Sequence, residues 1–93
     1  MQLKYTRPFL SRLEDIFAES DYMLRYEKGT FKSGFCVLKD VKVAVINKYF
    51  PLEGKINCLV EILRTIDIQP ESLTTPESQE LLLAIRNQTL ANA

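Results

Sequence analysis

Residues 35–64 read FCVLKDVKVAVINKYFPLEGKINCLVEILR, and this stretch decides the fold. Residues 35–38 are apolar, residues 41–46 are apolar except for Lys42 and rich in β-branched side chains, and successive residues of each would occupy opposite faces of a strand. Lys39-Asp40 between them fits a tight hairpin turn. Pro51 then begins a helix, because proline suits the first helical turn. One broad face of this helix is apolar: Leu52, Ile56, Leu59, Val60, Leu63 and Ile66. The stretch predicts a strand, a turn, a second strand and an amphipathic helix in succession.

The flanking sequence adds three elements. Apolar residues recur at helical spacing from about residue 8 to 19. Tyr22, Leu24 and Tyr26 alternate with polar or exposed positions, as in a half-buried strand. After a linker over residues 67–75, Thr75 and Pro76 form an N-cap and first-position pair that begins the last helix.

Together these elements predict an α+β fold in the order α-β-β-β-α-α. We expect a three-stranded antiparallel meander, packed on one face by helices. The length of 93 residues and the even composition predict one domain spanning residues 1–93, with residues 1–7 and 88–93 loosely held.

Composition limits the functions available to the chain. The net charge is zero, but residues 25–55 carry seven lysines and arginines against three acids, a net charge of +4. This excess is too sparse for a dedicated nucleic-acid binder. No apolar run approaches the length of a membrane span, and the N-terminus lacks the apolar core of a signal peptide. We therefore expect a cytoplasmic protein with no membrane partner.

The chain lacks the groups that common catalytic sites need. It has no histidine, which removes the usual general base near neutral pH and the usual metal ligand. Its three glycines, at positions 29, 34 and 54, are too far apart to form a phosphate loop. Cys36 and Cys58 are 22 positions apart and are interpreted as small buried hydrophobes. We expect no enzymatic activity, no cofactor and no metal.

The polar side of the central helix is the one candidate site. It carries Glu53, Asn57, Glu61 and Arg64, of which Glu61 and Arg64 are spaced to form an exposed ion pair. We interpret these four residues as surface or partner-contact residues rather than as a catalytic set.

The same helix carries a resemblance to ImmA/IrrE-type metallopeptidases. In that family a strand ending in asparagine leads through a short loop into a zinc helix with the motif HExxH. Here VAVIN ends at Asn47, and Val60-Glu61-Ile62-Leu63-Arg64 aligns with the motif. Glu61 matches the catalytic glutamate, whereas Val60 and Arg64 stand where zinc-binding histidines belong. The resemblance implies an inactive relative retained as a scaffold.

A second resemblance covers more of the chain. The sequence is similar to small bacterial proteins of unknown function with the pattern RYEKGxFxxGxCxLxxxxVxxxNxxxPLExxxxxLxxxL, which residues 25–63 carry. This resemblance implies no particular activity.

Two main hypotheses for function follow. The first is a non-catalytic cytoplasmic protein that acts through protein–protein contact, as a homodimer or with another protein. Its basis is that the apolar residues on a short sheet and on the last helix exceed what one core needs. The second is a weak nucleic-acid-binding module that uses the basic hairpin region, residues 25–55, and its aromatic residues. An enzyme that uses Cys36 or Glu61 is a third, less supported hypothesis.

Overall fold

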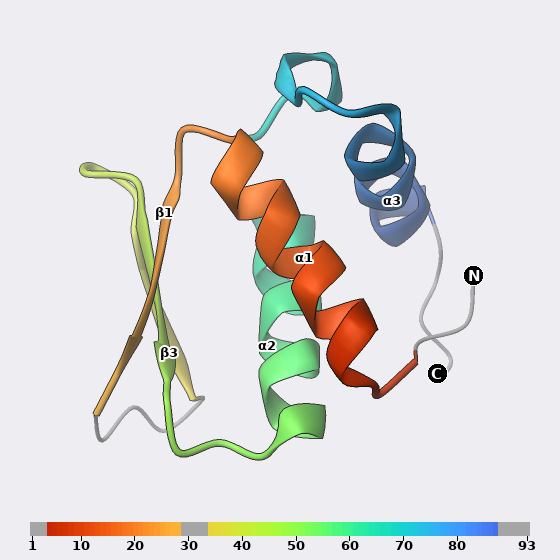
Figure 1. Cartoon of the computed structure of the whole chain (residues 1–93). Coiled ribbons are helices and arrows are strands. Elements are labelled where there is room, and N and C mark those ends of the chain that lie inside the picture. Colours follow the sequence, from red (N-terminus) through yellow and green to blue (C-terminus); the bar gives the residue numbers. More distant parts are fainter. Residues whose placement is uncertain (1–3, 29–33, 88–93) are drawn as a thin grey trace.

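The computed structural model describes residues 4–28 and 34–87 and confirms an α+β fold (Figure 1). Its elements are α1 (Arg7–Glu19), β1 (Met23–Glu27), β2 (Phe35–Leu38), β3 (Val43–Asn47), α2 (Leu52–Thr65), the short 3-10 helix η1 (Pro70–Ser72) and α3 (Pro76–Asn87). The sequence prediction lacked η1, which lies in the predicted linker. None of the helices in the described part of the chain is long and apolar enough to cross a membrane.

The prediction of an antiparallel meander was wrong. The sheet has the order β1-β3-β2, with β3 in the middle, and it is mixed. β3 pairs in parallel with β1, from Met23 opposite Val43 to Glu27 opposite Asn47, and antiparallel with β2. The physical reason lies in burial: Ala44 and Ile46 of β3 are completely buried, which requires neighbours on both sides. Alternation along a strand assigns side chains to faces but does not specify strand order.

The hairpin turn is also longer than predicted. The connection from β2 to β3 is a turn over residues 39–42, not the two-residue turn Lys39-Asp40. Lys42 has a φ of 54°, in the left-handed region that few non-glycine residues adopt. Its side chain forms an ion pair with Asp21 and its carbonyl accepts a hydrogen bond from the Met23 amide, which hold it in this conformation.

The helices form two layers on the same side of the sheet (Figure 1). α1 and α2 pack against each other and against the sheet, and α3 packs on both of them, away from the sheet. α2 is therefore enclosed from two sides, which explains why its buried face is wider than one helical stripe. The buried residues of α2 are Ile56, Cys58, Leu59, Val60, Ile62 and Leu63.

Two long-range side-chain contacts attach α3. The carboxylate of Glu19, at the end of α1, accepts hydrogen bonds from the amides of Thr74 and Thr75 and from the Thr75 and Ser78 hydroxyls. At the other end of α3, the guanidinium of Arg86 donates to three carbonyl oxygens, those of Leu63, Ile66 and Ile68, at 2.7–3.1 Å. α3 is thus bound at its start to α1 and near its end to the end of α2.

The N-terminal residues that the structure describes are attached to the helices. Thr6 is the N-cap of α1 and its hydroxyl accepts from the Phe9 amide. The Tyr5 hydroxyl donates to Asn57 Oδ1 at 2.9 Å. The sequence predicted residues 1–7 and 88–93 to be loosely held. Of these, residues 1–3 and 88–93 lie outside the described residues, whereas Thr6 and Arg7 belong to the start of α1.

Candidate interaction surfaces

The predicted polar side of α2 forms an exposed surface. Glu53, Asn57, Glu61 and Arg64 are all exposed. Three of them, Asn57, Glu61 and Arg64, line one open hollow of about 590 Å³ together with Val60 and Thr65. Glu53 lies one turn earlier and does not line it. The side chains that line this hollow all come from one helix, so the hollow is a shallow depression rather than an enclosed cleft.

Its chemistry is that of a solvated helix face. Among the described residues, Glu61 and Arg64 do not form the ion pair that their spacing allows; the two ion pairs are Arg25–Glu27 and Lys42–Asp21. The positions that align with the zinc ligands of the metallopeptidase motif also differ in setting, because Val60 is buried whereas Arg64 is exposed. Within residues 4–28 and 34–87, no group of three or more histidine, cysteine, aspartate or glutamate side chains could hold a metal ion.

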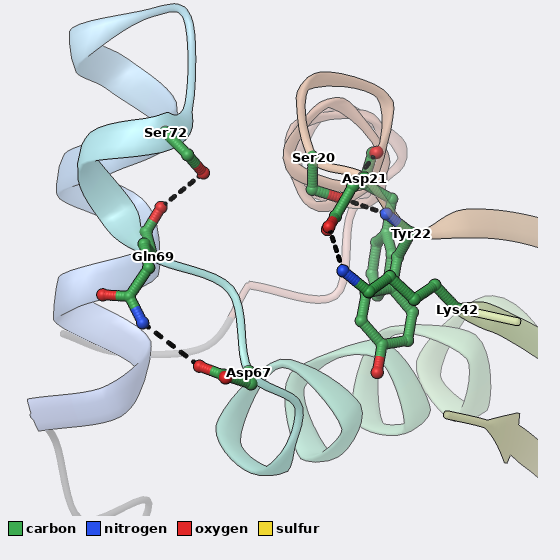
Figure 2. Close-up of polar contacts among 8 residues, drawn as sticks. Ser20, Asp21, Tyr22, Lys42, Asp67, Gln69 and Ser72 are labelled. Atoms are coloured by element: carbon green, nitrogen blue, oxygen red, sulfur yellow. Dashed lines mark hydrogen bonds and ion pairs between the residues drawn. The ribbon is translucent and has the colours of Figure 1, made fainter. Parts of the chain in front are cut away.

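A second polar hollow, of about 490 Å³, was not predicted. It lies where the end of α1, the turn before β3 and the segment between α2 and η1 meet (Figure 2). Asp21 pairs with Lys42 on one side, while on the other Gln69 donates to Asp67 and Ser72 donates to the Gln69 carbonyl. The nearby Tyr22 amide donates to Ser20 Oγ. Sequence alone gave no signal for this site, because its residues come from three distant segments.

The ion pair in this second hollow shifts the pKa of both of its members. The hydrogen bond and charge of Lys42 lower the pKa of Asp21 below its usual 3.8, and Asp21 in turn raises the pKa of Lys42 above 10.5. Both shifts move away from neutral pH, whereas a general acid or base works best with a pKa near the operating pH. The arrangement therefore favours a role in holding the Lys42 turn.

The aromatic residues in and next to the basic region mostly face the core. Tyr22 is buried, and Tyr26, Phe35 and Phe50 pack against the core. Tyr49 is exposed, with the Lys48 ammonium 5.3 Å from its ring centroid. Phe31 lies outside the described residues. A row of exposed aromatics for stacking bases therefore does not form among the described residues of this region.

Tyr26 is the centre of a contact between three elements. Its hydroxyl donates to Glu14 of α1, and the Lys55 ammonium of α2 lies 5.4 Å from its ring centroid. Burial, together with the hydrogen bond and negative charge of Glu14, raises the pKa of Tyr26 well above 10. The phenol thus stays protonated and fixes the inner face of β1 against the helices.

The two cysteines lie in different environments. Cys58 is buried in α2, and burial, with a contribution from the charge of Glu61, raises its pKa above 9.0. Cys36 is half-buried on β2, between Phe35 and Val37, which face the core, and so its side chain lies on the opposite face of the sheet. Neither forms a disulfide. A raised pKa lowers the thiolate fraction, so Cys58 has the character of a structural residue.

None of the elements in the described part of the chain covers the face of the sheet opposite the helices. Strand alternation and register place Met23, Val43 and Leu38 in one row across it, at the end near the turn over residues 39–42. Met23 is 59% exposed and Leu38 48%, and Val41 in the adjoining turn is 66% exposed. We call Met23, Leu38, Val41 and Val43 the apolar patch. Sequence alternation could have indicated it, but only the strand order shows that these residues are neighbours.

No family model, curated protein or solved structure matches the chain. The candidate surfaces are therefore interpreted from their own geometry.

Proposed function

We propose that this chain is a non-catalytic cytoplasmic protein that acts through protein–protein contact and forms a homodimer. The observation that carries the proposal is the one-sided sheet: the helices lie on one face, while the other face carries the apolar patch. Contiguous apolar surface of this kind is typical of contact sites in proteins.

The two polar hollows, on α2 and at Asp21 and Lys42, also favour a non-catalytic role. The exposed side chains of α2 line an open depression, and the polar hollow at Asp21 and Lys42 holds groups whose pKa values lie far from neutral. Two thiols without a disulfide suit the reducing conditions of a cytoplasm.

Light scattering coupled to size-exclusion chromatography tests the homodimer. We expect a mass of twice the chain mass at high micromolar concentration, which decreases toward the chain mass on dilution. A mass equal to one chain at every concentration would contradict the proposal.

The contribution of the apolar patch is tested separately. Replacing both Leu38 and Val41 with serine should lower the binding of a fluorescent dye that reports exposed apolar surface. The control is Leu83→Ser on α3, where a single leucine is 45% exposed. Equal dye binding by the wild type and the double variant would show that these side chains do not form a binding surface.

A further inference from the structure

β1 has an edge that no strand among the described residues covers. It is an outer strand of the sheet, and β3 occupies its other side. All five of its residues pair in one continuous register with β3, so it contains no bulge, and its sequence MLRYE contains no proline. Bulges and prolines are devices that keep edge strands from pairing with other chains. β1 has neither.

The direction of its main-chain groups follows from two hydrogen bonds. The Met23 amide donates to the Lys42 carbonyl, and the Glu27 carbonyl accepts from the Lys48 amide. In a parallel pair, alternate residues bond to the same neighbour, so Met23, Arg25 and Glu27 direct their main-chain groups toward β3. The amides and carbonyls of Leu24 and Tyr26 therefore point outward, where another strand can bond to them.

Space is available beside these groups. A hollow of about 580 Å³ runs between β1 and α1, with Leu24 and Tyr26 on the strand side and Glu14 and Ala18 on the helix side. The outward edge of β1 thus opens onto a concave surface rather than onto a covering element of the described chain.

From these observations we infer that two copies of this chain pair through β1, antiparallel, with Arg25 of each copy opposite Glu27 of the other. This inference rests on the proposed homodimer and specifies its interface. The two sheets would join into one continuous sheet across a twofold axis, which is the isologous arrangement most common in dimers.

The charges on the outer face of β1 select this register. The side chains of Arg25 and Glu27 are 55% and 44% exposed and form an ion pair within one chain, with 2.7 Å between Arg25 Nη2 and Glu27 Oε2. With Tyr26 opposite the partner's Tyr26, each Arg25 faces the partner's Glu27, and the outward main-chain groups meet as hydrogen-bonded pairs. Moving the register by one pair in either direction is unfavourable. Moving it one way places Arg25 opposite the partner's Arg25, and moving it the other way places Glu27 opposite the partner's Glu27. Like charges directly opposite destabilise a sheet.

The other edge does not offer such a pattern. β2 has only four residues, and its outer-face residues Cys36 and Leu38 are uncharged. They cannot select a register by charge. The apolar patch lies at the other end of the sheet from Glu27, so β1 pairing leaves it available for a different protein.

Charge reversal tests the interface. Arg25→Glu and Glu27→Arg each place like charges opposite one another twice across the twofold axis, and each should weaken the dimer about tenfold or more. The double variant R25E/E27R restores opposite charges and should recover the wild-type dissociation constant. An equimolar mixture of the two single variants should form a heterodimer. Arg7→Glu, at the exposed start of α1, changes the net charge by the same amount as Arg25→Glu and should have no effect.

Cysteine cross-linking tests the register. In a Cys36→Ser background, oxidation of a mixture of R25C and E27C chains should give a cross-linked heterodimer, because paired Cα atoms in a non-hydrogen-bonded pair lie within disulfide range. Each variant alone should cross-link poorly. Efficient cross-linking of R25C with itself would overturn the register.

The outcomes separate this inference from the proposed function. A wild-type protein that is monomeric at every concentration contradicts both. A wild-type dimer that both single charge reversals leave unchanged overturns the β1 interface and keeps the homodimer. Circular dichroism of each variant checks that the fold is retained, and recovery by R25E/E27R excludes unfolding as the cause of a loss.

Discussion

Glu19 is the last residue of α1, yet its carboxylate binds the first residues of α3. It accepts hydrogen bonds from two main-chain amides and two hydroxyls, so it holds the N-cap residue Thr75 in place from a distant part of the chain. Burial acts to raise its pKa, but the hydrogen bonds from Ser78, Thr75 and Thr74 outweigh this effect, and the pKa lies below 4.5. The charged form is therefore the one that the fold stabilises.

Glu19→Gln should lower the free energy of unfolding by about 1–2 kcal/mol near neutral pH, the usual cost of losing a cap. Because the folded pKa is depressed, the stabilisation by Glu19 is complete above pH 4.5 and is lost as the pH falls through the folded pKa. Urea unfolding at neutral and acidic pH should show a smaller loss on acidification in the variant than in the wild type. Glu77→Gln, an exposed control in the first turn of α3, should keep the wild-type pH dependence.

Phe50 explains two of the glycines. A Cβ on Gly34 would lie 2.2 Å from Phe50 Cε2, and one on Gly54 would lie 2.8 Å from Phe50 Cδ2. Gly34 also has a φ of +86°, a conformation that other residues rarely adopt, whereas Gly54 lies in the regular helix α2. Phe50 thus excludes a side chain at both positions, and at Gly34 the backbone conformation excludes it as well.

A Phe50→Ala background separates these reasons. Gly54→Ala should destabilise the wild type but stabilise the F50A protein by up to about 1 kcal/mol, since alanine is the better helix former once the ring is gone. Gly34→Ala should destabilise both, by about 1–3 kcal/mol, because its backbone strain remains. Thermal unfolding of the single and double variants measures these differences. Gly54→Ala with the same effect in both backgrounds would contradict the role of the ring.

At the scale of the elements, the carbonyl groups at the C-terminal end of α2 accept hydrogen bonds from a side chain of another helix, α3. The last carbonyls of a helix lack partners within it. Arg86 of α3 donates to the carbonyls of Leu63 and Ile66 and then to Ile68 beyond the helix. A guanidinium offers donors in a planar fork, which an ammonium group cannot imitate. This one residue thus fixes both the end of α2 and the angle at which α3 packs.

Arg86→Lys should therefore cost about 1–3 kcal/mol of unfolding free energy although the charge is kept. Arg64→Lys is the matched control, because Arg64 is an exposed residue in the last turn of α2 and its substitution should change stability by about 0.5 kcal/mol or less. Urea unfolding of both variants shows whether stability depends on the hydrogen bonds of the guanidinium or only on its positive charge. Equal stability of the two variants would show that the three hydrogen bonds contribute little.

Most elements could be predicted from local sequence. α1 follows from its helical spacing and Pro8, α3 and its cap from Thr75 and Pro76, and the strands from β-branched alternation, whereas the α1 cap Thr6 was not predicted. Thr75 does cap α3, since its hydroxyl accepts a hydrogen bond from the Ser78 amide. Leu73, in the predicted linker before α3, is buried. The contributions of Glu19 and Arg86 could not be predicted, because each acts on backbone that is distant in sequence. The sequence contains no strong local turn or capping pattern for η1 or for the longer hairpin turn, so neither was predicted.

At the scale of the whole molecule, the sequence placed residues on faces but did not order the strands. A meander and the observed sheet satisfy the same alternation, and only the burial of Ala44 and Ile46 requires β3 to be central. Three residues of the predicted polar surface, Asn57, Glu61 and Arg64, line one hollow, and their role in partner contact stays a prediction. The ion pair between Asp21 and Lys42 and the open edge of β1 depend on strand order, so neither was predictable from local pattern.

The central position of β3 also has a consequence for synthesis. A ribosome makes β1 and β2 before β3, and neither of the first two strands has its native partner until residue 47 has left the exit tunnel. Until then, the nascent chain holds two strands that run in opposite directions and lie one strand apart in the finished sheet. The last strand translated must enter between them, so the sheet is completed from its middle rather than from an edge.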